Sequence, residues 1–311
     1  VATSENMIKE SIAQIYIQIL YAAESVRVNE NTLQVSIAQR DRGQELLNAG
    51  SIAKSDFAQL EAQVSTDRYQ LVTAQATLQD YKLQLKQLLE LDGENEMNVY
   101  LPKLSDENVL APLPAKKDVY VSALAIRPEI EASKLNVEAS ELGIDIAKSS
   151  YFPTISLSAS IGTNHTSGSD FTFGEQVKNG WNNSIGLSVS VPIFNNRQTK
   201  SAVQKAKLQR ETDMLSLLDE QKALYKTIES LWLDANSAQQ RYAAANEKLR
   251  STQISYDLIS EQFNLGMKNT VELLTEKNNL LQAQQEQLQA KYMAILNTQL
   301  LKFYQGDKLT L

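Results

Sequence analysis

TISLSASIG at residues 154–162 and SIGLSVSVPI at residues 184–193 carry the strongest structural signal in this sequence. In both stretches apolar residues alternate with small polar residues or glycine, and this period of two predicts β-strands. Each stretch is about ten residues long, the length of a strand that crosses a membrane at a tilt. A half-buried strand of a soluble protein would alternate in the same way. A face of small hydroxyl groups, however, suits a water-filled lumen, and an Ile, Leu and Val face suits lipid.

Aromatic residues flank the two expected strands, as the girdles at a membrane interface do. They are Tyr151, Phe152, Phe171, Phe173, Trp181 and Phe194. The connection 163–183 is rich in Gly, Ser, Asn and Thr, and we expect an exposed outer loop there. Because two strands cannot close a barrel and an open strand edge cannot lie in lipid, we expect several copies of the chain to supply strands.

Two long stretches on either side of this segment are almost free of helix breakers. All six prolines lie between residues 102 and 192, and Gly266 is the only glycine between residues 195 and 305. Apolar or small residues recur at spacings of three and four, and from Leu274 to Ile295 they recur every seven residues. This period predicts long, packed helices that supercoil around one another.

Each helical stretch contains one short turn with a glycine near its centre, at 48–51 and at 264–267. Glycine adopts the left-handed conformation that ends many helices, so each stretch is expected to form an antiparallel helical hairpin. Asp56 and Glu272 occupy equivalent places after the two turns, which indicates a two-fold internal repeat. At about 1.5 Å per residue the helix 196–264 would be about 100 Å long, too long for an ordinary globular domain.

The predicted fold class is mainly α with a membrane β-hairpin: long coiled-coil hairpins forming an α-barrel, and strands contributing to an outer-membrane β-barrel. The expected segments are a first-repeat helical hairpin at 1–101, a linker or equatorial segment at 102–126 and a helix at 127–150. A β-hairpin with its outer loop follows at 151–195, and the second-repeat long hairpin occupies 196–311.

Composition excludes several classes of function. The 311 residues contain no cysteine and one histidine, His165, so disulfides, thiol nucleophiles and multi-histidine metal centres within one chain are excluded. The net charge of −7 argues against a nucleic-acid partner. No Ser-His-Asp set, phosphate-binding loop or dinucleotide fingerprint occurs, so we expect neither an enzyme nor a cofactor. Trp232 lies between two leucines of the long helix, and we expect it to pack rather than to bind a ligand.

An ordered set of motifs resembles the TolC family of bacterial outer-membrane efflux proteins. Arg127-Pro128-Glu129-Ile130 precedes a helix, YFPTISLSAS follows at 151–160, and NSIGLSVSVPIF at 183–194 is similar to the second strand of the family. The resemblance implies a homotrimer in the outer membrane, with a helical tunnel in the periplasm. Each protomer would give four strands to a twelve-stranded barrel, and the tunnel would meet a periplasmic adaptor and an inner-membrane pump. The complete chain is expected to be longer by about 90 residues plus a signal peptide.

The resemblance also implies a gate at the hairpin turns. Asp56 matches an acid that receives a link between hairpins, and Glu272 matches the first acid of a constriction. Lys268 stands where the family often has arginine, and it can pair either within its own helix or with Asp56. Phe263 stands where a tyrosine would donate a hydroxyl, and Thr275 stands where a second acid would be, so one acidic ring is expected. The alternative is that all of these are solvated residues beside a turn.

The turns themselves are candidate contacts for the adaptor. The residues concerned are Gly50, Ser51, Leu265, Gly266 and Met267, and helix capping alone is the alternative. We expect contact because Leu265 and Met267 have no local core in which to be buried. The whole-protein hypothesis is a passive exit duct. A periplasmic adaptor would have one helical hairpin between small β-domains, and a coiled-coil structural protein would leave the serine-lined strands unexplained. The sequence does not identify the transported substrate.

Overall fold

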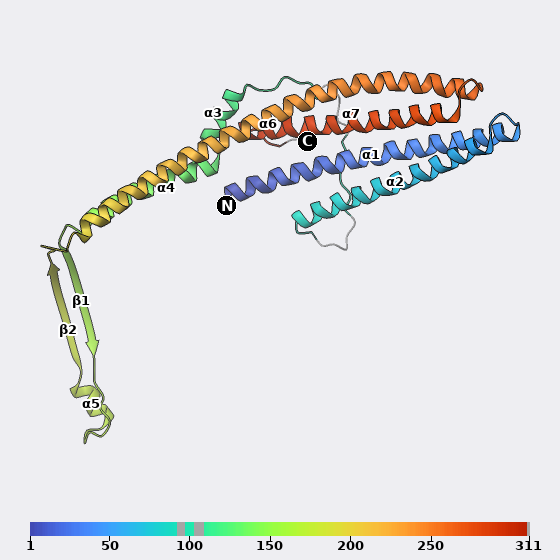
Figure 1. The fold of residues 1–311 in the computed structure, drawn as a ribbon. Coiled ribbons are helices and arrows are strands. Elements are labelled where there is room, and N and C mark those ends of the chain that lie inside the picture. The colour runs from blue at the N-terminus through green and yellow to red at the C-terminus, as the bar shows by residue number, and fades with distance from the viewer. Residues whose placement is uncertain (92–96, 103–108, 310–311) are drawn as a thin grey trace. The chain divides into compact units, whose positions relative to one another are not determined.

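The computed structural model describes residues 1–91, 97–102 and 109–309. The chain divides into two units, the first comprising residues 1–129 and 221–311 and the second residues 130–220. The described residues are mainly helical (Figure 1), as the sequence predicted. None of the helices in the described ranges has an apolar stretch long enough and sufficiently uncharged to cross a bilayer.

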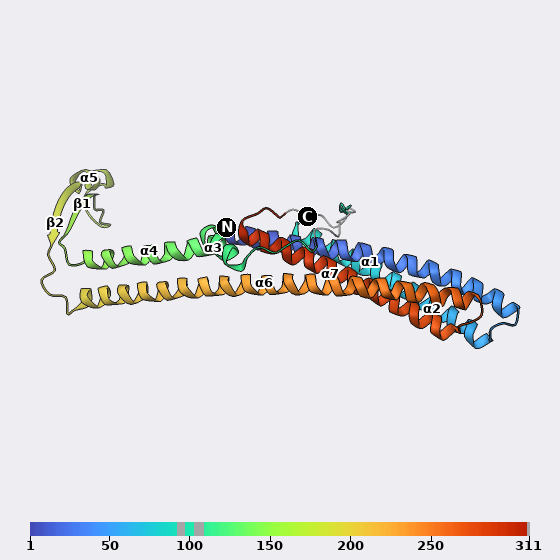
Figure 2. The same ribbon diagram turned by 90° about the horizontal axis from the view of Figure 1, so that it is seen from above.

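Two helical hairpins form most of the first unit. Helix α1 (Ala2–Asn48) turns back into α2 (Lys54–Leu88), and α6 (Gln198–Asn264), which belongs to this unit from residue 221, turns back into α7 (Thr270–Gln305). The two predicted turns are therefore present. Within this unit the hairpins run side by side, and both turns lie at the same end (Figures 1 and 2).

The two hairpins are held together by small apolar clusters spaced along the helices. Ile17 and Leu20 of α1 form one buried cluster with four residues of α7, which are Leu288, Tyr292, Leu296 and Leu300. Nearer the turns, Leu60 of α2 packs against Phe263 of α6 and Leu273 of α7. Burying each such side chain contributes about 1.5–3 kcal/mol. Within each helix the members of the first cluster lie three or four residues apart, which is the spacing seen in the sequence.

The segment before α3 (Lys116–Ile126) lies against α6. Gln239 of α6 donates hydrogen bonds to the backbone carbonyls of Val109 (2.9 Å) and Ala111 (2.8 Å). Trp232 Nε1 donates to the carbonyl of Pro114 at 3.0 Å, so its indole serves packing and linker attachment. The sequence predicted a linker or equatorial segment over 102–126, and within it residues 116–126 form α3. Residues 103–108 of that segment lie outside the described residues.

Arg127 joins α3 to α4 (Pro128–Ser149) and is almost completely buried. Its Nη2 lies 2.9 Å from Glu10 Oε1 of α1, and its Nε lies 3.3 Å from Glu129 Oε1. The guanidinium also stacks 3.6 Å from the ring centroid of Tyr304 on α7. Pro128 suits the first turn of a helix because it needs no amide hydrogen there. The Arg-Pro-Glu motif thus ties the start of α4 to α1 and α7.

The second unit contains the predicted β-hairpin. Strands β1 (Thr154–Gly162) and β2 (Asn182–Ser190) pair antiparallel, with Leu157 opposite Leu187 and Ser160 opposite Ser184. Over residues 154–160 this register pairs Ser, Thr or Gly on one face and Ile, Leu, Val or Ala on the other. Every residue of both strands is exposed in the single chain, so the sheet has no core of its own.

A short helix interrupts the loop between the strands. Helix α5 (Phe173–Asn179) begins after Thr172, whose backbone N–H donates to Glu175 Oε2 at 2.9 Å. The sequence predicted an exposed outer loop over 163–183. The loop is exposed, but the Thr172-x-x-Glu175 pattern is a capping box that starts a helix. His165 lies in the same loop, where its Nδ1 is 3.1 Å from Gln176 Oε1.

Candidate functional site

The two turns at the end of the first unit have the same backbone geometry. Gly50 and Gly266 both have positive φ angles, 72° and 74°. After each glycine the next residue closes the helix end, Ser51 N donating to Leu46 O (2.8 Å) and Met267 N to Gln262 O (2.8 Å). This is the Schellman arrangement, which requires a left-handed residue at the glycine position. The repeat seen in the sequence is therefore a repeat of turn geometry.

The candidate adaptor-contact residues are all exposed. Gly50, Ser51 and Gly266 are exposed, and Leu265 and Met267 leave 68% and 70% of their surface accessible. Among the described residues, none shields these two large apolar side chains at the tip of the hairpin. The turns therefore present an apolar surface, which suits contact with another protein.

The two acids that follow the turns have the same local role. The carboxylate of Asp56 accepts a hydrogen bond from Ala53 N at 3.3 Å, and that of Glu272 accepts from Asn269 N at 3.2 Å. Each therefore caps the first turn of its own helix, α2 or α7. Asn269 completes the second cap, because its Oδ1 accepts from Glu272 N at 2.9 Å.

Lys268 lies in the turn before α7 and pairs with Glu272 in the first turn of that helix. Its Nζ lies 2.6 Å from Glu272 Oε1, and both side chains are about one-third exposed or more. The hydrogen bond from Lys268 is the main reason why the pKa of Glu272 lies below its usual range, and the Asn269 N–H adds to the effect. Of the two partners that the sequence left open, the single chain thus selects Glu272, while Asp56 stays with Ala53.

Phe263 is buried in an apolar cluster, and Thr275 is exposed. The Phe263 ring is buried against Leu60 and Leu273, so this position joins the hairpins by packing. Thr275 is exposed, and its hydroxyl donates to the carbonyl of Val271 one turn earlier at 2.8 Å. Neither residue adds a charge to the region around Glu272.

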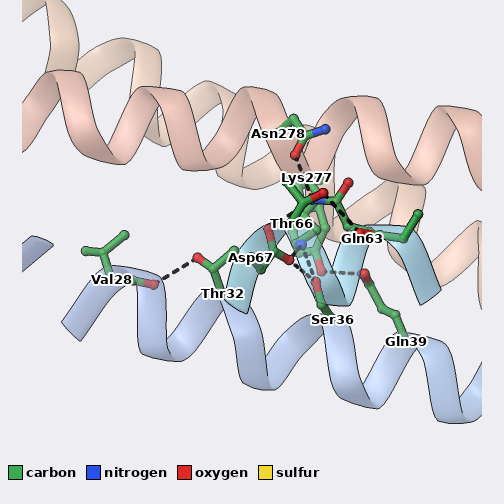
Figure 3. Close-up of polar contacts among 11 residues, drawn as sticks. Val28, Thr32, Ser36, Gln39, Gln63, Thr66, Asp67, Lys277 and Asn278 are labelled. Atoms are coloured by element: carbon green, nitrogen blue, oxygen red, sulfur yellow. Dashed lines mark hydrogen bonds and ion pairs between the residues drawn. The ribbon is translucent and has the colours of Figure 1, made fainter. Parts of the chain in front are cut away.

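Behind the turns, a buried ionic cluster links three helices (Figure 3). Lys277 of α7 donates to Asp67 of α2 and to Ser36 of α1, and Ser36 donates to Asp67. The side chains of Lys277 and Asp67 are only 3% and 2% exposed. The second carboxylate oxygen of Asp67 accepts from Gln63 at 2.9 Å. Both oxygens of this buried carboxylate are therefore hydrogen-bonded, as a buried charge requires.

Further polar contacts at the same level extend the cluster to the fourth helix. Gln39 of α1 donates to the hydroxyl of Tyr256 on α6 at 2.8 Å, and Ser255 of α6 donates to Glu276 of α7 at 3.0 Å. Gln63 also donates to Asn278 of α7 at 3.3 Å. We call this set the polar belt; its members are Ser36, Gln39, Gln63, Asp67, Ser255, Tyr256, Glu276, Lys277 and Asn278.

The polar belt forms a closed circuit around the bundle of four helices. Ser36 and Asp67 join α1 to α2, Asp67 and Lys277 join α2 to α7, and the contacts at Ser255 and Tyr256 complete the circuit through α6. Burial lowers the pKa of Lys277, while the hydrogen bond and charge of Asp67 oppose that shift. Burial also disfavours the charged form of Tyr256 and therefore raises its pKa, and the hydroxyl is neutral at physiological pH.

Sequence reasoning missed the polar belt, although the signal was present. Ser36, Asp67 and Lys277 each lie three residues after an apolar seam residue, namely Leu33, Val64 and Leu274. A polar residue in a position of the heptad that faces a partner helix is the pattern that specifies register in coiled coils. Within residues 1–91, 97–102 and 109–309, no cluster of His, Asp and Glu could hold a metal ion.

Comparison with known proteins agrees with this arrangement of hairpins and strands. A family model described as outer membrane efflux protein matches residues 119–306. The chain belongs to this family. The match includes the Arg127 junction, the β-hairpin and the whole of the second helical hairpin. It confirms the resemblance seen in the sequence.

Related efflux proteins match nearly the whole chain. The outer membrane efflux protein BepC of Brucella suis is 26% identical over 294 residues, which are 94% of this chain and 61% of that protein. The outer membrane protein TolC of Escherichia coli is 25% identical over 308 residues, 95% of this chain and 60% of that protein. The chain thus spans about 60% of the length of these relatives.

A solved structure of CusC shares the fold. The TM-score is 0.82 at 18% identity, and the alignment covers 99% of this chain and 70% of the CusC chain. In CusC, conformational changes accompany folding and transmembrane channel formation. At this level of identity, the similarity to CusC shows that the two chains share a fold.

Proposed function

We propose that the complete protein is the outer-membrane exit duct of a tripartite efflux or secretion system. It would be a passive channel that carries substrate from a periplasmic adaptor and an inner-membrane pump to the exterior. The observation that carries the proposal is the two-faced β-hairpin of an efflux-family chain. Ile155, Leu157 and Leu187 are each at least 70% exposed on one face, and serines cover the other. Lipid against the first face and water against the second would satisfy both.

The proposed assembly is a homotrimer with a β-barrel in the outer membrane and a helical tunnel in the periplasm. A two-stranded sheet with two open edges cannot be stable in lipid, because unpaired backbone groups there have no water to bind. Strands from neighbouring copies would pair with β1 and β2 and close the barrel. The mass of the full-length protein in detergent should correspond to three copies, and a stable monomer would contradict the assembly.

The proposed gate lies at the hairpin turns and consists of Asp56, Lys268 and Glu272. In a trimer three copies of Glu272 would meet around the axis, and a ring of carboxylates favours cations over anions. Lys268 neutralises part of this charge through its contact with Glu272. Lys268→Glu would place like charges together at the turns and loosen their closure. In planar bilayers, the full-length Lys268→Glu variant should therefore show a higher resting conductance than the unmodified protein. Glu272→Gln should show weaker cation preference, because it removes the charge of the ring.

A matched control separates the gate from a general effect of charge. Lys9 and Glu5 form an exposed pair with the same spacing of four residues, at 2.7 Å, on α1 and far along the chain from either turn. Lys9→Glu should leave resting conductance and ion selectivity unchanged. Unchanged conductance and selectivity in both turn variants would mean that Lys268 and Glu272 are ordinary surface residues.

The proposed adaptor contact consists of the two turns, Gly50-Ser51 and Leu265-Gly266-Met267. The exposed apolar side chains at positions 265 and 267 support it. Replacing Leu265 and Met267 together by serine should reduce chemical cross-linking of the channel to its adaptor in cells. Conductance in bilayers should stay normal, because no gate residue is changed. Undiminished cross-linking would place the adaptor contact elsewhere.

A further inference from the structure

The polar belt lies behind the proposed gate on every helix of the bundle. Lys277 is seven residues beyond the start of α7, and Ser36 is twelve residues before the end of α1. At 1.5 Å per residue these positions lie about 10–20 Å from the turns along the helices. A movement that starts at the turns and separates the two hairpins therefore reaches the polar belt after about two to three helical turns.

The polar belt and the turn residues differ sharply in how strongly they resist separation. Lys268 and Glu272 are exposed at 33% and 40%, and such solvated pairs contribute little to stability. Lys277 and Asp67 are almost fully buried, and removing one partner of such a pair shifts an equilibrium by roughly a hundred- to a thousandfold. Water can replace the first contact as it opens, but it cannot reach the second while the helices stay packed.

The contacts between the belt and the turns are of another kind. Leu60, Phe263 and Leu273 form an apolar cluster there, and apolar contact has no directional requirement. Such side chains can slide past one another and keep most of their buried surface. Hydrogen bonds at the polar belt depend on direction and distance, so they tolerate no comparable sliding.

From this contrast we propose that the polar belt is the fixed point of the gate. The four helices stay joined at Ser36, Asp67, Tyr256 and Lys277 while the hairpin tips beyond the belt move apart. Opening is then confined to the segments between the belt and the turns, and the belt keeps the two hairpins of one protomer in register in both states. The inference rests on the proposed channel function, because it concerns the movement of that gate.

Single thiols can locate the movement, because the 311 residues contain no cysteine. Thr270→Cys reports on the tips: Thr270 is 2% exposed at the start of α7, and its hydroxyl has no partner among the described residues. Val64→Cys reports on the belt: Val64 is 6% exposed and lies one turn from Asp67 on α2, but makes none of the belt contacts. Both substitutions are close to isosteric.

The experiment measures the rate at which a water-soluble maleimide modifies each thiol in the full-length protein in detergent. Adding Lys268→Glu should raise the rate at Thr270→Cys several-fold and leave the rate at Val64→Cys within twofold. If the rate at Val64→Cys rises together with that at Thr270→Cys, the belt opens with the gate and the proposal is wrong.

A second arm tests whether the ion pair holds the belt. Lys277→Met leaves the Asp67 carboxylate buried without its cation, and the rate at Val64→Cys should rise at least tenfold. The control is Lys248→Met, which removes an exposed lysine that lies 2.6 Å from Glu286 between α6 and α7; it should have no effect. The double variant Asp67→Leu with Lys277→Met should restore protection, because it leaves no unpaired charge.

The remaining outcomes are also decisive. If Lys277→Met does not assemble but the double variant does, the yield of trimer reports the same coupling and supports the proposal. If Lys277→Met leaves Val64→Cys protected, the ion pair does not hold the hairpins and the proposal fails. If the unmodified protein showed no conductance, the proposed channel function would be wrong. The second arm could still be measured, because thiol labelling at Val64→Cys requires no transport. If Lys268→Glu changes neither conductance nor labelling at position 270, there is no tip movement to confine, and the inference fails with the gate.

Discussion

Replacing Arg127 by methionine should destabilise the protein by about 3 kcal/mol. The side chain is 5% exposed, and Glu10 and Glu129 beside it are 23% and 24% exposed. Breaking a buried ion pair costs about 3–5 kcal/mol, and the lower value applies here because water reaches both acids. Loss of the contact with the Tyr304 ring adds about 1–2 kcal/mol. Burial of the methionine side chain returns about the same amount.

The measurement is the guanidinium midpoint of the full-length protein in detergent, followed by circular dichroism. A double variant, Glu10→Gln with Arg127→Met, should recover about 1–2 kcal/mol, because one unpaired carboxylate is removed. The control is Arg42→Met: Arg42 and Glu45 form an exposed pair at 2.6 Å, and its loss should cost less than about 0.5 kcal/mol. Equal midpoints for Arg127→Met and Arg42→Met would refute the anchoring role of the Arg-Pro-Glu motif.

Three smaller predictions concern single positions. Burial raises the pKa of Tyr292 from 10.0 to about 12. The folded state therefore binds more protons in this range, and the free energy of unfolding falls as pH rises from about 10 to about 12; Tyr292→Phe should make that fall shallower by about 1–2 kcal/mol, and an unchanged slope would contradict it. Gly143→Ala should stabilise α4 by about 0.5–1 kcal/mol, since open space surrounds the position and alanine favours a helix. Gly266→Ala should destabilise by about 1 kcal/mol or more because its φ is +74°; denaturation midpoints that shift in the same direction for both glycine variants would show that backbone conformation does not govern them.

The features that the sequence predicted well depend on local rules. A long stretch with few prolines and glycines predicts a helix, and apolar residues at a period of two predict a strand. The turn at Gly266 and the strand at 154–162 therefore appear where the sequence placed them. Both short helices were missed for a related reason: α3 lies in a segment interrupted by Pro112 and Pro114, and α5 lies in a loop of turn-forming residues. In each case composition outweighed a short helical signal.

The part of the site that sequence could not supply depends on which helices become neighbours. Lys268 has an acid four residues after it and another on a different hairpin, and spacing alone does not choose between them. The same applies to Lys277, whose partners Ser36 and Asp67 are more than 200 positions away along the chain. A charge in a helix seam indicates that some partner exists, but only the packed hairpins identify it.

The internal repeat is asymmetric at the point where the gate is proposed. Asp56 and Glu272 both cap the first turn of a helix, so capping alone explains why an acid occurs at each position. The residue four places earlier differs, however: it is Ile52 in the first repeat and Lys268 in the second. Glu272→Gln therefore weakens a cap and removes the charged partner of Lys268, whereas Asp56→Asn weakens a cap alone. If the two changes affected conductance equally, capping would be their shared cause. A larger effect at Glu272 would isolate the contribution of the lysine, which only the second repeat contains at this place.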